Sequence, residues 1–548
     1  MTAVELLETG DAALQAGRWA DALAAFERAL GEEETAGALA GVGEALWWLG
    51  EPRRSIAYHE RAYTAFRRAG EAARAAWTAM WLCLAYKADL GNQAAASGWI
   101  ARAERVLQDA DPDPMRGWLC WTRAFETTDV ELAQELLERA LELARALGDV
   151  DLELCALADL GEALVVMGRV EKGFALIDEA MAGTLGGEYT RLDTVVFTCC
   201  SMLNACELGA DLARATQWCR VADDFIQRYG CPYLYAECRT TYGGILVATG
   251  RWDDAERELT TAVGMTRDAW PAMHALALAR LADLRLRQGR LEEAEGLLEG
   301  VEDDLAATLP TAALRLAQGE PAVSVALLQR RLHLLGEKHI EATLMLELLV
   351  DASLAQGDLD GAAAAAERLG ELALGRDRDH VAARAARAVA RVSLARGEPD
   401  AAVPQLETAV ERLSRLDLPF EAARARLDLA RALANREPAV AVAEARSAFA
   451  AFDRLGAAAD ADAAAAFLRT LGATGRSGPK QVGVLTKREQ EVLHLVGFGL
   501  SNPEIAGRLV ISRKTAAHHV SSVLAKLGLR NRAEAVAYAT RNLGKVAP

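Results

Sequence analysis

The sequence predicts an all-α protein, an α-solenoid of helical hairpins followed by a four-helix domain. Three observations support this fold class. A turn glycine followed by an alanine-rich amphipathic segment recurs along residues 1–471. Helix-start signals stand at close spacing within residues 485–545. Residues 472–484, between these parts, hold four glycines and a proline, which predicts a flexible linker.

The spacing of the turn glycines sets the length of the repeat. Most are 38 to 41 residues apart, and the 77-residue gap after Gly91 fits two units, with Asp129 at the middle position. Each unit has room for two helices that are apolar along one face and bury that face only by stacking. We expect eleven or twelve units. The turn glycines are Gly17, Gly50, Gly91, Gly168, Gly209, Gly250, Gly289, Gly319, Gly357 and Gly397.

The small residues of these units resemble those of tetratricopeptide repeats, in a longer variety. In the first unit they are Gly10, Gly17, Ala22, Phe26 and Ala29. The resemblance implies helices that approach closely at the small positions. Gly43 is interpreted in the same way, as a close-packing residue. The many Asp and Glu residues on the repeat helices are interpreted as solvated faces.

Tryptophan is concentrated near the N-terminus, where eight of the eleven lie before residue 122. Two interpretations stay open: packing between helices, or a stacking surface for a ligand or peptide in the concave groove. The nine cysteines include no C-x-x-C pair. They are read as buried small apolar side chains, with a thiol sensor or metal site as the alternative.

Three helix-start signals organise the C-terminal domain. Thr486 with Glu489, and Ser501 with Glu504, have the spacing of capping boxes, and Ser512 is a further N-cap. They predict helices over 487–498, 502–509 and 513–527, with a fourth over about 532–541. The second and third form a helix-turn-helix, residues 502–521.

The third helix has two distinct faces. At 3.6-residue spacing one stripe is apolar and should face the core. The opposite stripe has short or polar side chains and one cation, which suits a helix lying in a DNA major groove. The core stripe is Ala516, Val520, Val523, Leu524 and Leu527, and the outer stripe is Lys514, Ala517, His518, Ser521 and Ala525.

Charge also separates this domain from the rest of the chain. Residues 480–548 hold eleven Lys and Arg and four Asp and Glu, a net of +7. The whole chain carries −17, so residues 1–479 carry −24. A basic module on an acidic body is typical of binding to a phosphate backbone at one end of a protein.

The segment from Leu485 resembles the LuxR-type DNA-binding domain over about sixty residues. The resemblance implies base reading by Ala517, His518 and Ser521, backbone contacts from Lys514, Thr515 and Lys526, and a DNA-bound dimer through the fourth helix, with Val536 and Tyr538. The family usually has Lys at the position of Ala517 and often a longer polar side chain at Ser521. The matching residues are Leu485-Thr486, Glu489, Glu491-Val492-Leu493, Gly499-Leu500-Ser501-Asn502, Glu504-Ile505-Ala506, Leu509, Ile511-Ser512, Lys514-Thr515, His519-Val520, Lys526-Leu527-Gly528 and Arg530-Asn531-Arg532.

We therefore expect a transcriptional regulator that binds a double-stranded DNA operator as a homodimer. The solenoid would sense an unknown ligand or protein, and RNA polymerase is a further candidate partner. No P-loop, G-x-S-x-G or H-E-x-x-H motif occurs, so we expect no enzyme, cofactor or metal site. Without an apolar span or signal peptide, a cytoplasmic, nucleoid-associated protein is expected. The alternative is an interaction scaffold whose basic domain is not a specific DNA reader.

Overall fold

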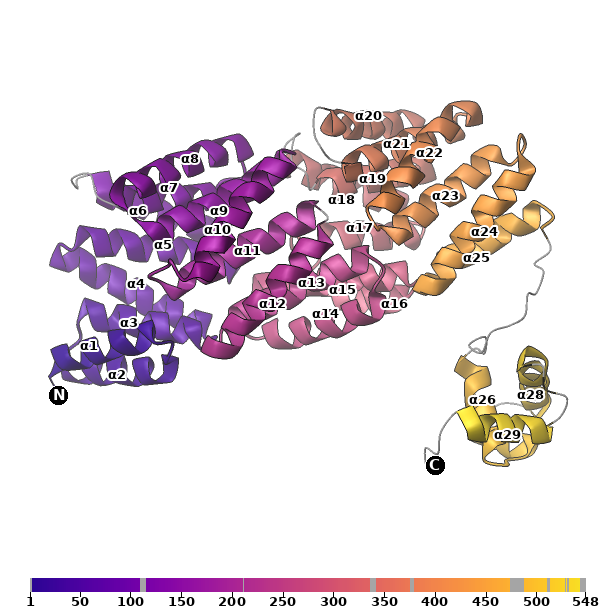
Figure 1. Ribbon diagram of the computed structural model, residues 1–548, viewed down its shortest axis with the longest axis horizontal. Helices are drawn as coiled ribbons and strands as arrows, with labels where there is room; N and C mark the ends of the chain where they lie inside the picture. Colours follow the sequence, from indigo (N-terminus) through magenta and orange to yellow (C-terminus); the bar gives the residue numbers. More distant parts are fainter. Residues whose placement is uncertain are drawn as a thin grey trace. The chain divides into compact units, whose positions relative to one another are not determined.

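The computed structural model describes residues 2–108, 115–209, 211–335, 342–374, 379–473, 487–509, 513–527, 529 and 532–542. The chain divides into two compact units, Met1–Leu471 and Gly472–Pro548. Every regular element in these ranges is an α-helix, which confirms the all-α prediction (Figure 1). Most of the predicted linker, from residue 474 to 484, lies outside the described residues.

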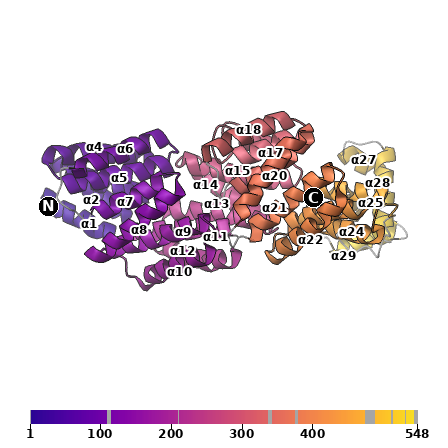
Figure 2. The ribbon, with the colours of Figure 1, turned by 90° about the horizontal axis from the view of Figure 1, so that it is seen from above.

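The first unit is a stack of antiparallel helical hairpins, as predicted, and Figure 2 shows the same succession from above. Its first helices are α1 (Ala3–Gln15), α2 (Trp19–Glu32), α3 (Ala36–Trp48), α4 (Pro52–Ala69), α5 (Ala72–Ala88), α6 (Gln93–Gln108), α7 (Met115–Glu126), α8 (Val130–Leu147), α9 (Val150–Val166), α10 (Val170–Gly186), α11 (Leu192–Gly209) and α12 (Leu212–Tyr229). The stack continues with α13 (Pro232–Ala248), α14 (Trp252–Thr266), α15 (Pro271–Arg287), α16 (Leu291–Leu298), α17 (Thr308–Ala317), α18 (Pro321–Leu335), α19 (Ala342–Gln356), α20 (Leu359–Ala373), α21 (Asp379–Ala395), α22 (Pro399–Arg415), α23 (Pro419–Leu433), α24 (Pro438–Leu455) and α25 (Ala458–Thr470).

The turn glycines end helices because their φ angles lie in the left-handed region, which residues with a Cβ rarely adopt. Nine of the ten predicted positions have a positive φ, between 66° at Gly91 and 86° at Gly168. Gly209 differs: it is the last residue of α11, and Asp211 caps the next helix by accepting from Arg214 N–H. Gly209 therefore stands directly before the turn as the last helical residue and is not a left-handed residue within it.

Successive turns of the superhelix touch one another. The turn at Gly17 lies against Tyr229, and Trp19 Nε1 donates to the Tyr229 carbonyl at 2.5 Å. The turn at Gly250 likewise lies against Pro419. The loop after α1 therefore rests on the end of α12, and the loop after α13 rests on the start of α23.

Some helices approach so closely that only glycine fits. α9 and α10 cross at Gly161 and Gly173, where a Cβ on Gly161 would lie 2.6 Å from the Gly173 carbonyl oxygen. A Cβ on Gly173 would lie 2.5 Å from the Gly161 carbonyl oxygen. Backbone faces backbone here, so neither side can yield by a rotamer change. Gly43 is also a close-packing residue, as predicted, since a Cβ there would overlap His59.

Gly161→Ala is expected to destabilise the protein by about 1–3 kcal/mol, because the added methyl group forces α9 and α10 apart. The matched control is Gly98→Ala, an exposed position inside α6 with no atom within 4 Å of the added Cβ. Alanine there should stabilise by about 0.5–1 kcal/mol through helix propensity. Urea unfolding of the two variants and the wild type measures both effects. A Gly161→Ala protein as stable as wild type would contradict the crossing described.

The tryptophans near the N-terminus join neighbouring hairpins. Trp19 stacks on Trp48 with ring centroids 4.2 Å apart, and Trp77 meets Trp118 edge to face at 5.2 Å. These contacts confirm a packing role. Five tryptophans also line an internal cavity, so the alternative of a ligand surface is not removed.

All nine cysteines are reduced, and none is exposed. Burial raises the pKa of each thiol, to about 12 for Cys199, so the reactive thiolate is disfavoured at neutral pH. This agrees with the reading of small apolar side chains. Within the described ranges, no group of three or more His, Cys, Asp or Glu side chains has the arrangement of a metal site.

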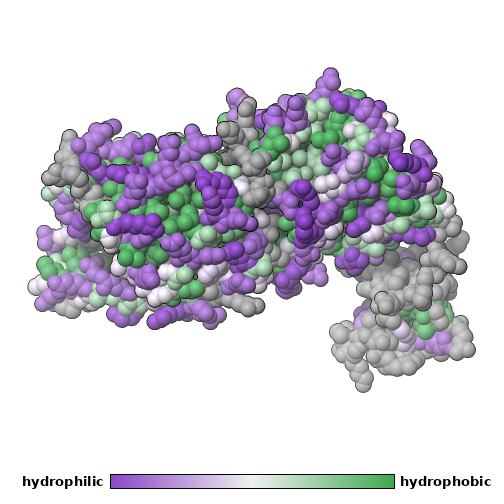
Figure 3. Space-filling view, turned by 45° about the horizontal axis from the view of Figure 1, so that its top comes forward, coloured by the Kyte–Doolittle hydropathy of each residue, from purple (hydrophilic) through white to green (hydrophobic). Residues whose placement is uncertain are grey.

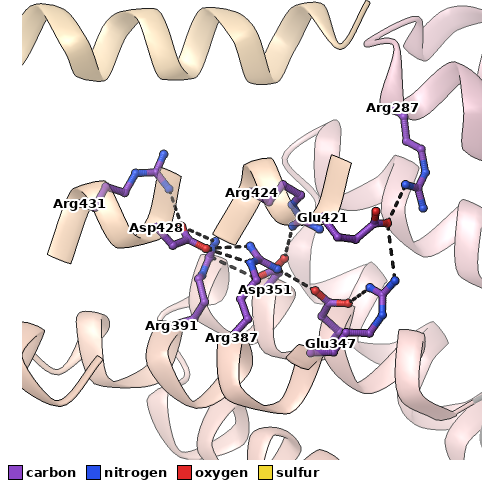
Figure 4. A network of polar contacts seen from close by, with 10 residues as sticks. Arg287, Glu347, Asp351, Arg387, Arg391, Glu421, Arg424, Asp428 and Arg431 are labelled. Carbon is purple, nitrogen blue, oxygen red and sulfur yellow. Dashed lines mark hydrogen bonds and ion pairs between the residues drawn. The ribbon is translucent and has the colours of Figure 1, made fainter. Parts of the chain in front are cut away.

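A buried network of charged side chains joins α15, α19, α21 and α23 (Figure 4). Arg387 lies at its centre, donating to Glu347 Oε1 at 2.8 Å and to Asp428 Oδ2 at 3.0 Å. Arg287 donates to Glu421 Oε1 at 2.8 Å. The carboxylates of Glu347, Asp428 and Glu421 are buried, so the reading of repeat-helix carboxylates as solvated faces is wrong for these three.

Hydrophilic residues cover most of the visible face of the first unit, with hydrophobic residues between them (Figure 3). Large exposed hydrophobic side chains such as Val4, Leu185 and Leu374 stand far apart in the chain. Among the helices described, none is both long and apolar enough to cross a membrane.

In its described residues the second unit has four helices: α26 (Lys487–Gly497), α27 (Asn502–Leu509), α28 (Arg513–Leu527) and α29 (Arg532–Asn542). They share one small core, with Val492, Ile505, Val520 and Ala539 buried in it. The observed bounds agree with the predicted ranges to within one residue.

Candidate nucleic-acid interface

The start of α27 is fixed by the predicted pair Ser501 and Glu504. Glu504 Oε2 accepts from the Ser501 backbone N–H at 2.6 Å and from its hydroxyl at 2.6 Å. These two bonds lower the pKa of Glu504. The carboxylate half of a capping box is thus formed, while the hydroxyl donates to the same carboxylate oxygen. Gly499, with φ of +81°, turns the chain after α26.

The core face of α28 is the predicted one. Ala516, Val520 and Val523 are buried, and Leu524 and Leu527 pack partly buried against the same core. Because successive residues of an α-helix are rotated by 100°, this stripe fixes the register of the whole helix. This register keeps the prediction that positions 514, 518 and 521 face away from the core, whereas Ala517 is half-buried beside it.

The residues predicted to touch DNA all lie on α28. Ala517 is half-buried at the edge of the domain. The side chains of His518 and Ser521, the other predicted base readers, lie outside the described part of the chain. The same holds for the predicted backbone contacts, Lys514, Thr515 and Lys526. The assignment of these roles stays a prediction that rests on helix register.

α29 contributes to the core of its own domain as well as to the surface. Val536 and Tyr538, the predicted dimer contacts, pack partly buried against this core. A Cβ on Gly497 of α26 would lie 2.8 Å from the Ala539 Cβ, so these two helices cross closely. Only part of Val536 and Tyr538 remains for a partner, and the dimer contact stays a prediction.

Arg532 has a structural role that the sequence did not reveal. Its Nη1 donates to Asn502 Oδ1 at 2.9 Å, and its Nη2 donates to the Leu500 carbonyl. These bonds join the first turn of α29 to the segment that begins α27. The only signal in the sequence was its place in the Arg530-Asn531-Arg532 match, which gives no partner.

A short capped helix, α27, followed in the chain by a longer helix, α28, that shares its core is the arrangement of a helix-turn-helix. Residues 483–539 match the family described as "Bacterial regulatory proteins, luxR family". The C-terminal segment is therefore a luxR-type helix-turn-helix domain, which confirms the resemblance drawn from its residues.

Curated relatives match over the same part of the chain. Transcriptional regulatory protein LnrK of Bacillus subtilis is 44% identical over 63 residues, 12% of this chain and 29% of the relative. LiaR of Bacillus subtilis is 45% identical over 58 residues, which are 11% of this chain and 28% of LiaR. The CsgBAC operon transcriptional regulatory protein of Escherichia coli is 37% identical over 79 residues, which are 14% of this chain and 37% of the relative. The chain thus spans less than two fifths of the length of these relatives.

Two solved structures align with most of the chain at low similarity. The Cut9–Hcn1 hetero-tetramer structure covers 84% of this chain and 96% of its own, with 12% identity and a TM-score of 0.36. The alignment with yeast Tom70 covers 85% of this chain and 96% of the Tom70 chain, with 13% identity and a TM-score of 0.27.

Proposed function

We propose that this protein is a transcriptional regulator that binds a double-stranded DNA operator through α28. The observation that carries the proposal is the luxR-family match over residues 483–539 on a domain whose α27 and α28 form a helix-turn-helix. The net charge of +7 on residues 480–548 supports it, because phosphate contacts supply much of the affinity for DNA. The curated relatives named above are transcriptional regulatory proteins.

In the proposed complex α28 lies in the major groove. His518, Ser521 and Ala517 face base edges, and Lys514, Thr515 and Lys526 contact the backbone. Few side chains of one domain reach bases, so two copies would bind a near-palindrome with half-sites about one helical turn apart. α29, with the exposed parts of Val536 and Tyr538, is the proposed contact between them.

The first unit is proposed to be the sensing part. Residues 1–479 carry −24 and repel a phosphate backbone, so this unit is suited to a ligand or protein partner instead. RNA polymerase is a candidate partner of the DNA-bound form. Footprinting of the full chain on its own upstream DNA tests the proposal. Protection that does not depend on sequence would favour the alternative, a scaffold whose basic domain is not a specific reader.

His518→Ala is expected to cost roughly 1–3 kcal/mol on the operator and little on scrambled DNA, because a base contact discriminates between sequences. Lys526→Ala should weaken both affinities alike and reduce the salt slope by about one counterion, since a phosphate contact reads no sequence. Titrations of both duplexes at several salt concentrations measure these effects.

Lys172→Ala serves as the control, because Lys172 is an exposed lysine on α10 of the first unit and should leave both affinities unchanged. If His518→Ala lowered both affinities alike while Lys526→Ala altered only the operator, the proposed docking of α28 would be wrong.

A further inference from the structure

The first unit contains a cavity of about 510 Å³ with many aromatic side chains in its lining. Its walls come mainly from α3, α5, α7, α8, α9 and α11, with α13 and the end of α18 also lining it. This volume lies within the range of about 300–1,000 Å³ that is usual for sites of small ligands.

One wall of the cavity is aromatic, with Trp47, Trp77, Trp81, Trp121 and Phe197. Trp81 is held by His59, which stacks on it with ring centroids 3.8 Å apart. Trp77 already carries a cation, since the Arg191 guanidinium lies over its ring at 4.1 Å. The faces of these rings are negative and attract positive charge.

Carboxyl groups outnumber basic groups around the cavity. The five carboxyls are Glu44, Asp89, Asp159, Glu162 and Asp193, and the three basic side chains are Lys87, Arg191 and Arg331. The only histidine at the wall is His59, and burial lowers its pKa to about 4, so it adds no charge at neutral pH.

Two of the basic groups are already engaged. Arg191 donates from Nε and Nη2 to Asp193 at 3.0 and 2.5 Å. Lys87 Nζ donates to the carbonyls of Phe125 and Glu126 at 2.5 and 3.1 Å. Glu44, Asp89 and Asp159 form no ion pair with any residue that the structure describes. The cavity therefore has carboxyl groups without a cation.

Among Glu44, Asp89 and Asp159, Asp89 has the most deeply buried side chain. Its side chain lies at the cavity wall and is 1% exposed. The Trp47 indole bonds to it, yet its Oδ2 has no hydrogen-bond partner among the described groups. A buried acceptor left without a donor costs about 1–3 kcal/mol. A donor is needed at this point, and a positively charged donor would also compensate the excess of carboxyls.

We propose that this cavity binds a small organic cation, with its ammonium group donating to Asp89 and its apolar body against Trp47, Trp77 and Trp81. Without a bound cation, Asp89 holds its proton at neutral pH and Glu44 holds its own about half of the time. A cation would let Asp89 ionise and release its proton, which neither a neutral nor an anionic ligand does. This inference names a ligand class for the sensing role proposed above. It rests on that role only where an effect of the ligand on DNA binding is concerned. Binding of the ligand is measurable without DNA.

The test is calorimetric titration of the full chain with phenethylammonium, with phenethyl alcohol as the neutral analogue and hydrocinnamate as the anionic analogue. We expect the ammonium to bind at least tenfold more tightly than the alcohol, and hydrocinnamate not to bind. No heat and no thermal shift with phenethylammonium at up to about 10 mM would overturn the proposal. Equal affinity of alcohol and ammonium would also overturn it, in favour of a neutral ligand.

Asp89→Asn should weaken the ammonium at least tenfold and leave the alcohol unchanged, because asparagine keeps the shape but cannot ionise to pair with the ammonium group. Asp360→Asn, at an exposed position of α20, is the matched control and should bind as the wild type does. Glu44→Gln gives a second variant at the wall. If neither Asp89→Asn nor Glu44→Gln weakened the ammonium, the cavity would not be its site. Loss of operator binding with ligand binding intact would instead point to failure of the proposed function.

Discussion

Arg387→Met is expected to lower the stability of the solenoid by about 3–5 kcal/mol, because it removes the central cation from a buried network. Arg387 is 3% exposed and bonds to Glu347 on α19 and Asp428 on α23 (Figure 4). Burial alone would raise the pKa of Glu347, but Arg384 and Arg387 outweigh it and hold the pKa at about 2. Without Arg387 two buried carboxylates lose a partner.

The rest of the network does not replace the lost cation. Arg391 lies 3.8 Å from Asp428 and already pairs with Asp351 at 3.2 Å, and Arg431 bonds to Asp428 from a more exposed position at 2.9 Å. Arg384 already serves both Glu347 and Glu421. The carboxylates would therefore protonate or admit water, and either change weakens the contact between α19, α21 and α23.

Arg61→Met is the matched control, since Arg61 pairs with Glu34 at 2.9 Å on the surface, where both side chains are about half exposed or more. An exposed pair is worth about 0–1 kcal/mol. A repeat array can unfold in stages, so hydrogen exchange of α21 and α23 should accompany urea unfolding. If Arg387→Met were no less stable than Arg61→Met, the network would not stabilise the fold.

The second large expected effect is a loss of stability as the pH rises, caused by the carboxyl groups at the cavity wall. Burial raises the pKa of Asp89 to about 8 and of Asp159 to about 6, and enclosure raises that of Glu44 to about 7 although its side chain is open to the cavity. Between about pH 4 and each raised value the folded protein holds a proton that the unfolded chain has released. Stability therefore falls as pH rises through this window.

For the buried network around Arg387, stability falls as the pH is lowered. The pKa of Glu347 is about 2 when folded, below its ordinary value of 4.5, so its contribution is complete above pH 4.5 and is lost as pH falls towards 2. Together the two groups of carboxyls predict maximum stability of the ligand-free protein near pH 4.5.

Asp89→Asn should remove the largest part of the loss at high pH. One pK unit corresponds to about 1.4 kcal/mol, so a shift from 3.8 to about 8 sets an upper bound of about 6 kcal/mol for this side chain. The variant should be more stable than wild type at pH 8 and nearly equal to it at pH 4.5. Thermal unfolding midpoints across this range measure the difference, with Asp360→Asn following the wild type. Parallel curves for wild type and Asp89→Asn would contradict an ionisation penalty at Asp89.

Local signals predicted the C-terminal domain almost to the residue. The pair Ser501 and Glu504 begins α27, and the apolar stripe from Ala516 to Leu527 gives the register of α28. Such signals act within one or two helical turns, so the sequence alone contains them. Arg532 shows the limit, because its partners Leu500 and Asn502 lie some thirty residues earlier.

For the solenoid, the sequence alone determined the unit and most of its turns, because a left-handed turn needs glycine and an amphipathic helix has a fixed period. The tertiary structure decided which units meet after one superhelical turn, as at Trp19 and Tyr229, 210 residues apart. It also decided that Glu347 and Asp428 are buried against arginines, and that Asp89 lies at the wall of a cavity. A charged or aromatic residue on a helix has the same local pattern whether that face meets water or another turn of the stack. Only the winding of the whole chain distinguishes these environments.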